Sequence, residues 1–250
     1  MKPLYRINGL VHWNQQEILM RERMQATFAE GVFDWLRSVN NAWRMDRVEA
    51  PMMLPMRLVN PNYTLDDLWV FKDHDETEPT LVARPETTPS TYAWMVDQLE
   101  GHNSVKLPWC VWQVGKSFRV EQAQVLKNMR LKEFWQQEFQ CAYSIDTAND
   151  YHANCLEPMR KMLGSAVGLP TRIVESDRLP SYSLTTMDIE VDTGERWMEI
   201  CSISKRIDFP IKNKYQAKNK EWKETDILVL EIAIGLDRTV YAKSLYDSHL

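Results

Sequence analysis

The chain has 250 residues and a formal net charge of −5 at neutral pH. This length suits one large domain or two small ones and is enough for a substantial core. A mildly acidic chain gives no global sign of nucleic-acid binding, so any such contact would need a local basic patch. No apolar run reaches membrane-spanning length, and the N-terminus has no apolar signal-peptide segment.

The cysteines are far apart in the sequence, at Cys110, Cys141, Cys155 and Cys201. They form no Cys-x-x-Cys pair, and no histidine pair has zinc-ligand spacing. This pattern predicts a cytoplasmic protein with reduced thiols that hold no metal.

The chain begins with a predicted amphipathic helix over residues 15–40, which Asn14 can cap. Its apolar residues recur at helical spacing. A strand-like piece follows over residues 47–55. Its prolines, Pro51 and Pro55, confine it to an edge or an interface, because proline cannot donate to a strand ladder.

The central part of the chain predicts a polar loop, a helix and a hairpin. Residues 60–80 are polar and rich in turn formers, which predicts a loop around a short helix. A brief strand then leads into Arg84-Pro85-Glu86-Thr87, and a helix is expected from about Ser90. Two strands joined by a polar turn are expected over residues 107–121 and 131–144.

This hairpin can gather chemically useful side chains on one face. Residues two apart on a strand share a face, so Arg119 and Glu121 project together. The returning strand can add Phe134 and Glu138. A guanidinium, a flat ring and two carboxylates suit a nucleoside triphosphate and an ammonium group. The alternative is an ordinary hairpin with one solvated and one buried face.

The C-terminal half predicts a further helix and a run of strands. Lysines and arginines are dense over residues 205–223, which predicts either a solvated loop or a phosphate-backbone contact. The other elements expected are a helix over 146–163, strands over 171–176, 182–192 and 196–208, and a strand that turns at Gly235 into a helix from Leu236. The whole predicts a single α+β domain over residues 1–250, with a mainly antiparallel sheet flanked by helices.

Six phrases of the chain resemble one known family when they are taken together. They are ARPETTP (83–89), VGKSFRVE (114–121), MRLKEFWQQEF (129–139), TTMDIEV (185–191), WMEICSISKRIDF (197–209) and VLEIAIGLDR (229–238). In order and type they resemble the three-motif catalytic core of class II aminoacyl-tRNA synthetases, and within it the glycyl branch of the glycyl/threonyl/prolyl/histidyl group. Motif 1 would span about residues 28–55, motif 2 about 110–140 and motif 3 about 227–245.

The resemblance implies a bent ATP on an antiparallel sheet and a homodimer formed across motif 1. Catalysis would rest on Arg119 and Arg238, which stabilise charge without a protein nucleophile or base. The resemblance implies a contact with ATP or its metal for each of six residues. Arg119 would bind the α-phosphate and also the amino-acid carboxylate, and Arg130 would bind the terminal phosphates. Glu121 would accept from the adenine amino group, Phe134 and Arg238 would lie on the two adenine faces, and Glu231 would bind Mg²⁺.

The amino-acid pocket that the resemblance implies is acidic. Glu86 and Glu138 would hold the ammonium group, although each alone reads as an ordinary surface acid. Glu199 and Arg206 match positions that line the same pocket. Ala233 stands where glycyl enzymes have the serine of a Glu-Pro-Ser phrase, so the substrate is expected to be glycine or another small amino acid. Discrimination by one methylene is worth only about 1–3 kcal/mol.

The function expected is ATP-dependent amino-acid activation, followed by transfer to a tRNA acceptor end or to a non-tRNA acceptor. The sequence shows no anticodon-binding domain after motif 3 and no zinc ligands of the threonyl type. Two alternatives remain open. One is a non-catalytic paralogue that acts as an accessory or regulatory subunit, since fold does not fix function. The other is a partial synthetase that needs a separate RNA-binding subunit.

Overall fold

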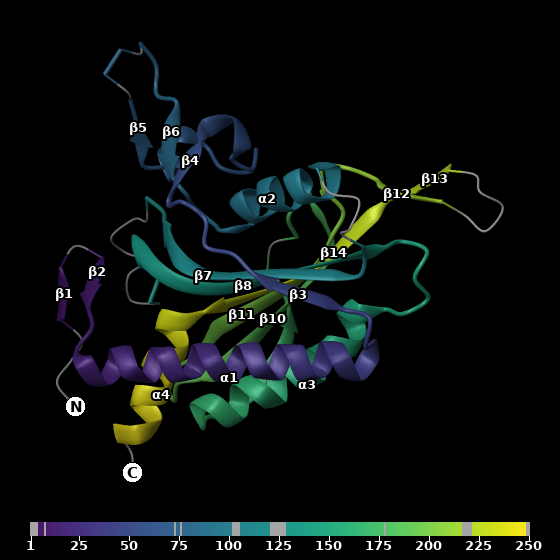
Figure 1. Ribbon diagram of the computed structural model, residues 1–250. Helices are drawn as coiled ribbons and strands as arrows, with labels where there is room; N and C mark the ends of the chain where they lie inside the picture. The colour runs from purple at the N-terminus through teal and green to yellow at the C-terminus, as the bar shows by residue number, and fades with distance from the viewer. Residues whose placement is uncertain are drawn as a thin grey trace.

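A seven-stranded sheet forms the centre of the computed structural model, in the order β3–β7–β8–β14–β11–β10–β9 (Figure 1). Neighbouring strands are antiparallel except β3 and β7, which are parallel. The predicted α+β fold with a mainly antiparallel sheet is therefore confirmed. In chain order, the strands are β3 (Arg44–Arg47), β7 (Trp109–Phe118), β8 (Glu133–Ser144), β9 (Thr171–Glu175), β10 (Ser183–Asp192), β11 (Trp197–Arg206) and β14 (Ile227–Gly235). The structure describes residues 5–7, 9–72, 74–75, 77–101, 106–120, 129–177, 179–216 and 222–248.

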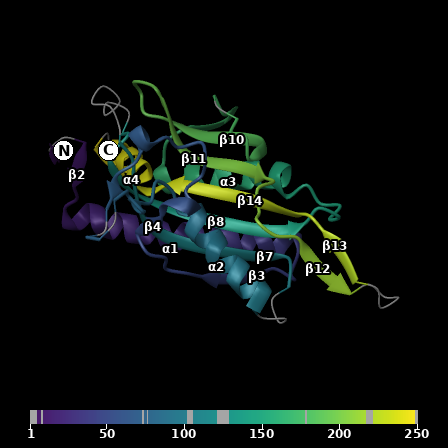
Figure 2. The same ribbon diagram turned by 90° about the horizontal axis from the view of Figure 1, so that it is seen from above.

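Three helices cover one face of this sheet, and a fourth lies on the other face (Figures 1 and 2). The covering helices are α1 (Gln15–Val39), α3 (Tyr151–Val167) and α4 (Leu236–Ser248), and α2 (Thr88–Gly101) lies opposite. The largest apolar core fills the space between the three helices and the sheet, with Phe28, Leu36, Phe139 and Leu163 fully buried. The α2 side of the sheet is therefore the side that remains open for a ligand. In the described part of the chain, no helix is both long and apolar enough to cross a membrane.

Helix α1 confirms the first predicted element. The Asn14 side chain accepts from the Glu17 N–H at 3.1 Å, and the Glu17 carboxylate accepts from the Asn14 N–H at 2.8 Å. This reciprocal capping box satisfies two backbone donors that a helix start leaves free. Phe28, Val32 and Leu36 are buried at a spacing of four residues, as a core-facing stripe requires.

The prediction of a single strand over residues 47–55 is wrong. Strand β3 ends at Arg47 on the edge of the central sheet, whereas β4 (Met53–Pro55) belongs to a separate sheet with β6 (Leu81–Ala83) and β5 (Val70–Phe71). Asp46 explains the early start of β3, because its carboxylate accepts from the Trp109 indole of β7 at 2.7 Å. Pro55 lies on an edge strand of the small sheet, where no donor is needed.

Two helices start at other residues than predicted, and local capping explains the boundaries of α3. Helix α3 starts at Tyr151 because the Asp150 side chain caps it, and it ends where Gly168 adopts a left-handed conformation with φ 79°. Helix α2 starts two residues before Ser90.

The remaining elements are β1 (Tyr5–Ile7), β2 (Leu10–His12), the 3₁₀ turns η1 (Met56–Leu58) and η2 (Leu65–Asp67), β12 (Asn213–Gln216) and β13 (Trp222–Thr225). The basic segment 205–223, predicted as a solvated loop or a phosphate-backbone contact, includes β12 and the start of β13, which pair with each other.

Arg84 is a charged side chain that is packed beneath the open face. It is only 2% exposed, and its guanidinium donates to the Lys116 carbonyl at 2.9 Å, the Ala50 carbonyl at 3.1 Å and the Gln113 side-chain oxygen at 3.0 Å. A Cβ added at Gly115 would overlap the Arg84 Nη2 atom. Glycine at 115 therefore makes room for this buried arginine.

We expect Gly115→Ala to lower the free energy of unfolding by about 1–3 kcal/mol, the usual cost of overpacking a core. Urea unfolding measures the change. Gly101→Ala is the control, because nothing lies within 4 Å of a Cβ there, and it should stay within about 0.5 kcal/mol of the unsubstituted chain. Equal stability of the two variants would contradict the packing described for Arg84.

Candidate active site

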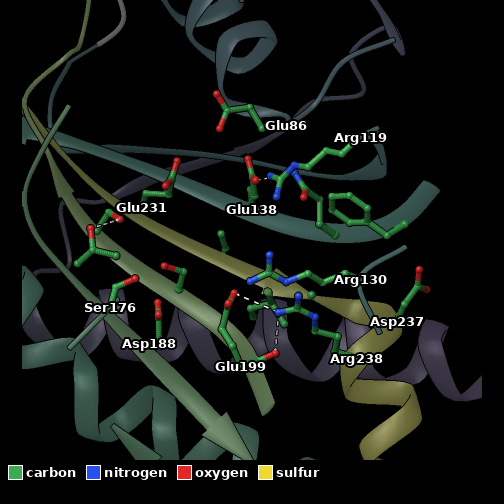
Figure 3. Close-up of a pocket in the computed structure, with 18 of the residues that line it drawn as sticks. Glu86, Arg119, Arg130, Glu138, Ser176, Asp188, Glu199, Glu231, Asp237 and Arg238 are labelled. Carbon is green, nitrogen blue, oxygen red and sulfur yellow. Dashed lines mark hydrogen bonds and ion pairs between the residues drawn. The ribbon is translucent and has the colours of Figure 1, made fainter. Parts of the chain in front are cut away.

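A cavity of about 490 Å³ opens on the α2 side of the sheet (Figure 3). Its walls come from the β7–β8 hairpin, the segment before α2, the strands β10, β11 and β14, and the start of α4. Of the eleven residues predicted for the site, nine line this cavity: Glu86, Arg119, Arg130, Phe134, Glu138, Glu199, Glu231, Ala233 and Arg238. The two exceptions are Glu121, which lies outside the described residues, and Arg206, which lies behind the wall.

The strand register explains why these side chains meet. Residues that are directly opposite on paired strands point to the same face. Glu138 of β8 is opposite Ala233 of β14, and Glu231 of β14 is opposite Ser204 of β11. Phe134 follows the same alternation on β8, four residues before Glu138. The predicted sharing of one face by Phe134 and Glu138 is thus seen in the structure.

Arg119 is fixed at the end of β7. Its Nε donates to the Pro85 carbonyl at 3.0 Å, and its guanidinium carbon lies 5.2 Å from the centre of the Phe134 ring and 5.7 Å from that of the Tyr63 ring. A guanidinium held between two rings and a carbonyl loses little freedom when it binds an anion. The bond to Pro85 also ties Arg119 to the residue that precedes Glu86.

Arg238 is fixed at the start of α4 by β11. Its Nη1 donates to the Glu199 carbonyl at 3.0 Å and lies 3.3 Å from a Glu199 carboxylate oxygen. Arg130 lines the same cavity, and both arginines also border an adjoining hollow of about 160 Å³. Figure 3 shows Arg130 and Arg238 together on one wall. Guanidinium groups of this kind suit phosphate oxygens.

The opposite end of the cavity is acidic, and Glu231 is its best-held carboxylate. Its Oε2 accepts from Thr88 Oγ1 at 2.7 Å, Gln140 Nε2 at 2.8 Å and Arg206 Nη1 at 2.7 Å. Arg206 is 1% exposed and also binds both oxygens of Asp208, at 3.0 and 2.6 Å. Arg206 therefore positions Glu231 from behind instead of lining the cavity.

Glu86 and Glu138 are buried at the same end of the cavity, where their negative charge is less well stabilised than that of Glu231. Burial, and then the charge of Glu231, raises the pKa of Glu138 to about 8. Burial raises the pKa of Glu86 to about 7 although Arg206 opposes the shift. Glu86 Oε1 is buried and has no hydrogen-bond partner within the described residues. An added cation would stabilise the ionised forms of both acids.

Sequence reasoning missed several polar residues around these acids. Thr87 donates to Glu138, and Gln136 donates to the other Glu138 oxygen at 2.5 Å. Thr88 and Gln140 hold Glu231, as described above. The alternation of Gln136, Glu138 and Gln140 along β8 was a usable signal, because side chains two apart share a face.

The described residues contain no group of three or more His, Cys, Asp or Glu side chains arranged to hold a metal ion. Glu231 was expected to bind Mg²⁺. Its three hydrogen bonds all reach Oε2, so Oε1 is the oxygen left for a cation. Mg²⁺ at a nucleotide takes one or two protein carboxylates and draws its other ligands from phosphates and water. One carboxylate oxygen fits that pattern.

The sequence was compared with known families. Residues 63–244 match the model described as the tRNA synthetase class II core domain (G, H, P, S and T). The chain belongs to this family.

Curated class II relatives with similar sequences include glycine–tRNA ligases. The ligase of Mycoplasmopsis synoviae is 28% identical over 180 residues, and that of Mycoplasma capricolum is 30% identical over 181 residues. Each match covers 67% of this chain and 40% of the relative. The chain thus spans about 40% of the length of these relatives.

Solved class II structures share the fold. Prolyl-tRNA synthetase from Cryptosporidium parvum, complexed with halofuginone and AMPPNP, superposes with a TM-score of 0.71 at 14% identity, over 96% of this chain and 48% of that chain. The Giardia lamblia prolyl-tRNA synthetase in complex with prolyl-adenylate gives 0.70 at 17% identity, with the same coverage. These two matches establish the architecture of a class II catalytic core.

Proposed function

We propose that this chain activates an amino acid with ATP. The carboxylate oxygen of the amino acid attacks the α-phosphorus, an aminoacyl-adenylate forms, and pyrophosphate leaves. The observation that carries the proposal is one cavity that holds Arg119, Arg238 and Phe134 together with the carboxylates Glu86 and Glu138. Family membership, the glycine–tRNA ligase relatives and the AMPPNP and prolyl-adenylate complexes of the structural neighbours support it.

On the nucleotide side, the proposal places adenine between Phe134 and Arg238. Arg130 would bind the terminal phosphates. Arg119 would bind the α-phosphate and the amino-acid carboxylate, and so hold the two reactants together. Negative charge grows on the α-phosphate oxygens during attack, and a guanidinium that is already fixed stabilises it without reorganisation. Glu121 would accept from the adenine amino group.

On the amino-acid side, the ammonium group would lie between Glu86 and Glu138. These acids come from two different segments, and Arg206 lies behind them, paired with Glu231. Ala233 offers a methyl group and no hydrogen-bonding group at the pocket wall. We propose glycine or another small amino acid as the substrate. The Glu199 carboxylate is expected to act on the nucleotide side of this pocket, since it contacts Arg238.

Magnesium would bind together with ATP, with Glu231 Oε1 as a protein ligand and phosphate oxygens as the others. Its chemistry there would be to neutralise phosphate charge and hold the chain of phosphates in its bent form. The protein's own part is to hold the Glu231 side chain in place through the three donors to Oε2.

The acceptor, the assembly state and the location belong to the same proposal. The activated amino acid would pass to a tRNA acceptor end or to a non-tRNA acceptor. A homodimer would form across motif 1, that is, through α1 and the edge strand β3 (Figure 1). We place the protein in the cytoplasm, where buried free thiols such as those of this chain persist.

Exchange of radiolabelled pyrophosphate into ATP tests the proposal across the twenty amino acids. Exchange that depends on glycine or another small amino acid is the expected result. Absence of exchange with every amino acid, from a folded chain, would refute it. Calorimetry with ATP then decides the alternative, because a chain that neither exchanges nor binds ATP would be the accessory paralogue.

Amino-acid affinity is expected to rise with pH. The pKa is raised to about 7 for Glu86 and to about 8 for Glu138, so both acids of the empty site are mostly protonated at pH 6. An ammonium group favours the ionised carboxylates, so binding must release these protons, and affinity gains up to about tenfold per pH unit for each proton released. Calorimetric titration of amino acid at pH 6, 7 and 8 measures the trend.

Glu138→Gln is the matched variant for this titration. It cannot ionise, so its amino-acid affinity should be lower and should depend less on pH. Constant affinity of the unsubstituted chain from pH 6 to pH 8 would contradict the proton release.

A further inference from the structure

One hydrogen bond joins the two elements that would supply the two sides of the adenine site. The Trp135 backbone N–H of β8 donates to Asp237 Oδ2 of α4 at 2.9 Å. Trp135 directly follows Phe134, and Asp237 directly precedes Arg238. The bond therefore joins the residue next to Phe134 to the residue next to Arg238. These are the two side chains proposed to lie on either side of adenine.

Asp237 is held in an environment that disfavours its charge. It is 3% exposed, and its Oδ1 is buried without a hydrogen-bond partner among the described residues. Burial raises the pKa of Asp237 to about 7, and the Trp135 N–H, Arg21 and Lys116 offset only part of the shift while Glu133 adds to it. A carboxylate kept in such a place costs stability, and perturbed acids of this kind are frequent at functional sites.

The hydrogen bond of Asp237 joins α4 to the sheet, whereas an ordinary helix cap binds a backbone N–H of its own helix. Asp237 lies in the first turn of α4, where a negative charge also interacts favourably with the helix dipole. Its Oδ2 reaches across to β8, so it fixes α4 to the sheet. Arg21 of α1 lies 4.4 Å from the Trp135 ring centre and supports the same contact from the helical side. Asp237 also lines the cavity itself (Figure 3).

We infer that Asp237 is a positioning residue for the nucleotide: its bond to Trp135 sets the gap between Phe134 and Arg238 to the thickness of a purine ring. This inference rests on the proposed function. It concerns adenine alone, because the ammonium end is built by Glu86, on the segment before α2, and by Glu138, which lies three residues beyond Trp135 in the interior of β8. Loss of the bond should therefore weaken ATP binding and leave amino-acid binding almost unchanged.

The test compares Asp237→Ala with Asp237→Asn in the exchange assay. Alanine cannot accept from the Trp135 N–H, and the KM for ATP should rise about 10- to 100-fold, since small misplacement of reacting groups has effects of this size. The asparagine side-chain oxygen can still accept, so Asp237→Asn should keep the KM for ATP within about threefold of the parent. The KM for the amino acid should stay within about threefold in both.

Asp150→Ala controls for loss of stability. Asp150 also receives a backbone N–H at a helix start, but it caps α3 and does not line the cavity. Its removal should lower the melting temperature and leave the KM for ATP unchanged. Calorimetry with AMPPNP repeats the comparison without turnover, and the same order of affinities is expected.

Each outcome has one meaning. If the unsubstituted chain is active and Asp237→Ala keeps its KM for ATP, the inference is wrong and the proposed function stands. An Asp237→Asn variant as impaired as Asp237→Ala would also overturn it, because charge and not the bond would then matter. Loss of exchange and of AMPPNP binding in the unsubstituted chain would instead refute the proposed function.

Discussion

Replacing Arg119 with alanine is expected to lower the rate of amino-acid-dependent pyrophosphate exchange by about 10³-fold or more, the range seen when a phosphate-stabilising arginine is lost. Arg119 is the one group proposed to contact both reactants. Its guanidinium is fixed by the Pro85 carbonyl and by the rings of Phe134 and Tyr63. Alanine removes both the charge that stabilises the transition state and the link between the reactants.

Three measurements make this result specific. The free energy of unfolding of Arg119→Ala should fall by only about 0.5–1.5 kcal/mol, the net worth of one hydrogen bond. Arg160→Ala is the matched control, because Arg160 pairs with Glu157 on α3, on the opposite face of the sheet. Arg119→Lys should recover little of the rate, since an ammonium group cannot form the two-pronged contact. Exchange above one tenth of the parent rate in Arg119→Ala would show that the site is misassigned.

Replacing Arg206 with methionine is expected to lower the free energy of unfolding by about 3–5 kcal/mol, the usual effect of removing one partner of a buried ion pair. Arg206 is the counter-ion of Glu231 at 2.7 Å and of Asp208 at 2.6 Å. Its guanidinium carbon also lies 3.9 Å from the Tyr182 ring centre. Methionine fills a similar volume but leaves two carboxylates without their cation. Urea unfolding gives the change directly.

The same variant should also weaken the binding of ATP together with Mg²⁺. Without Arg206, Glu231 loses its charge partner, and the carboxylate proposed as the Mg²⁺ ligand is displaced. Arg37→Met serves as the control, because Arg37 and its partner Asp34 are solvent-exposed at a distance of 3.6 Å, and exposed pairs contribute only about 0–1 kcal/mol. A loss below about 1 kcal/mol in Arg206→Met would contradict the buried network.

Local patterns were enough to predict the regular elements that frame the site. The cap at Asn14 and the apolar spacing of four residues gave α1, and alternation gave β7 and β8 with Phe134 and Glu138 on one face. The turn at Gly235 correctly ended β14. Each of these signals lies within a few residues of the element that it describes.

Other features depend on contacts between segments far apart in the chain, and no local pattern reveals them. Sequence reasoning gave Arg84 no role, yet it is buried against Gly115 and Gln113. Arg206 was expected in the pocket wall, whereas Glu231 stands in front of it. The place of Asp237 follows from its bond to Trp135, over a hundred residues earlier.

One of two missed elements had a usable signal in the sequence, and the other had none. Asn8-Gly9 lies between short apolar runs, which is a strong hairpin signal, and the hairpin of β1 and β2 is present there. The strand over 47–55 was placed too late because Arg44–Arg47 looks too polar for a strand. Its pairing with β7 depends on Asp46 and Trp109, which the sequence does not connect.

The proposed function requires that one cavity bind the nucleotide and the amino acid at once. Calorimetric titration with a non-hydrolysable glycyl-adenylate analogue, a glycyl-sulfamoyl adenosine, tests it without turnover or an acceptor. We expect one site per chain that binds the analogue at least about 100-fold more tightly than AMP, because reaction-intermediate analogues gain both sets of contacts. This gain should vanish in Arg119→Ala. Equal affinities for the analogue and for AMP would show that the carboxylate end does not belong to the nucleotide site.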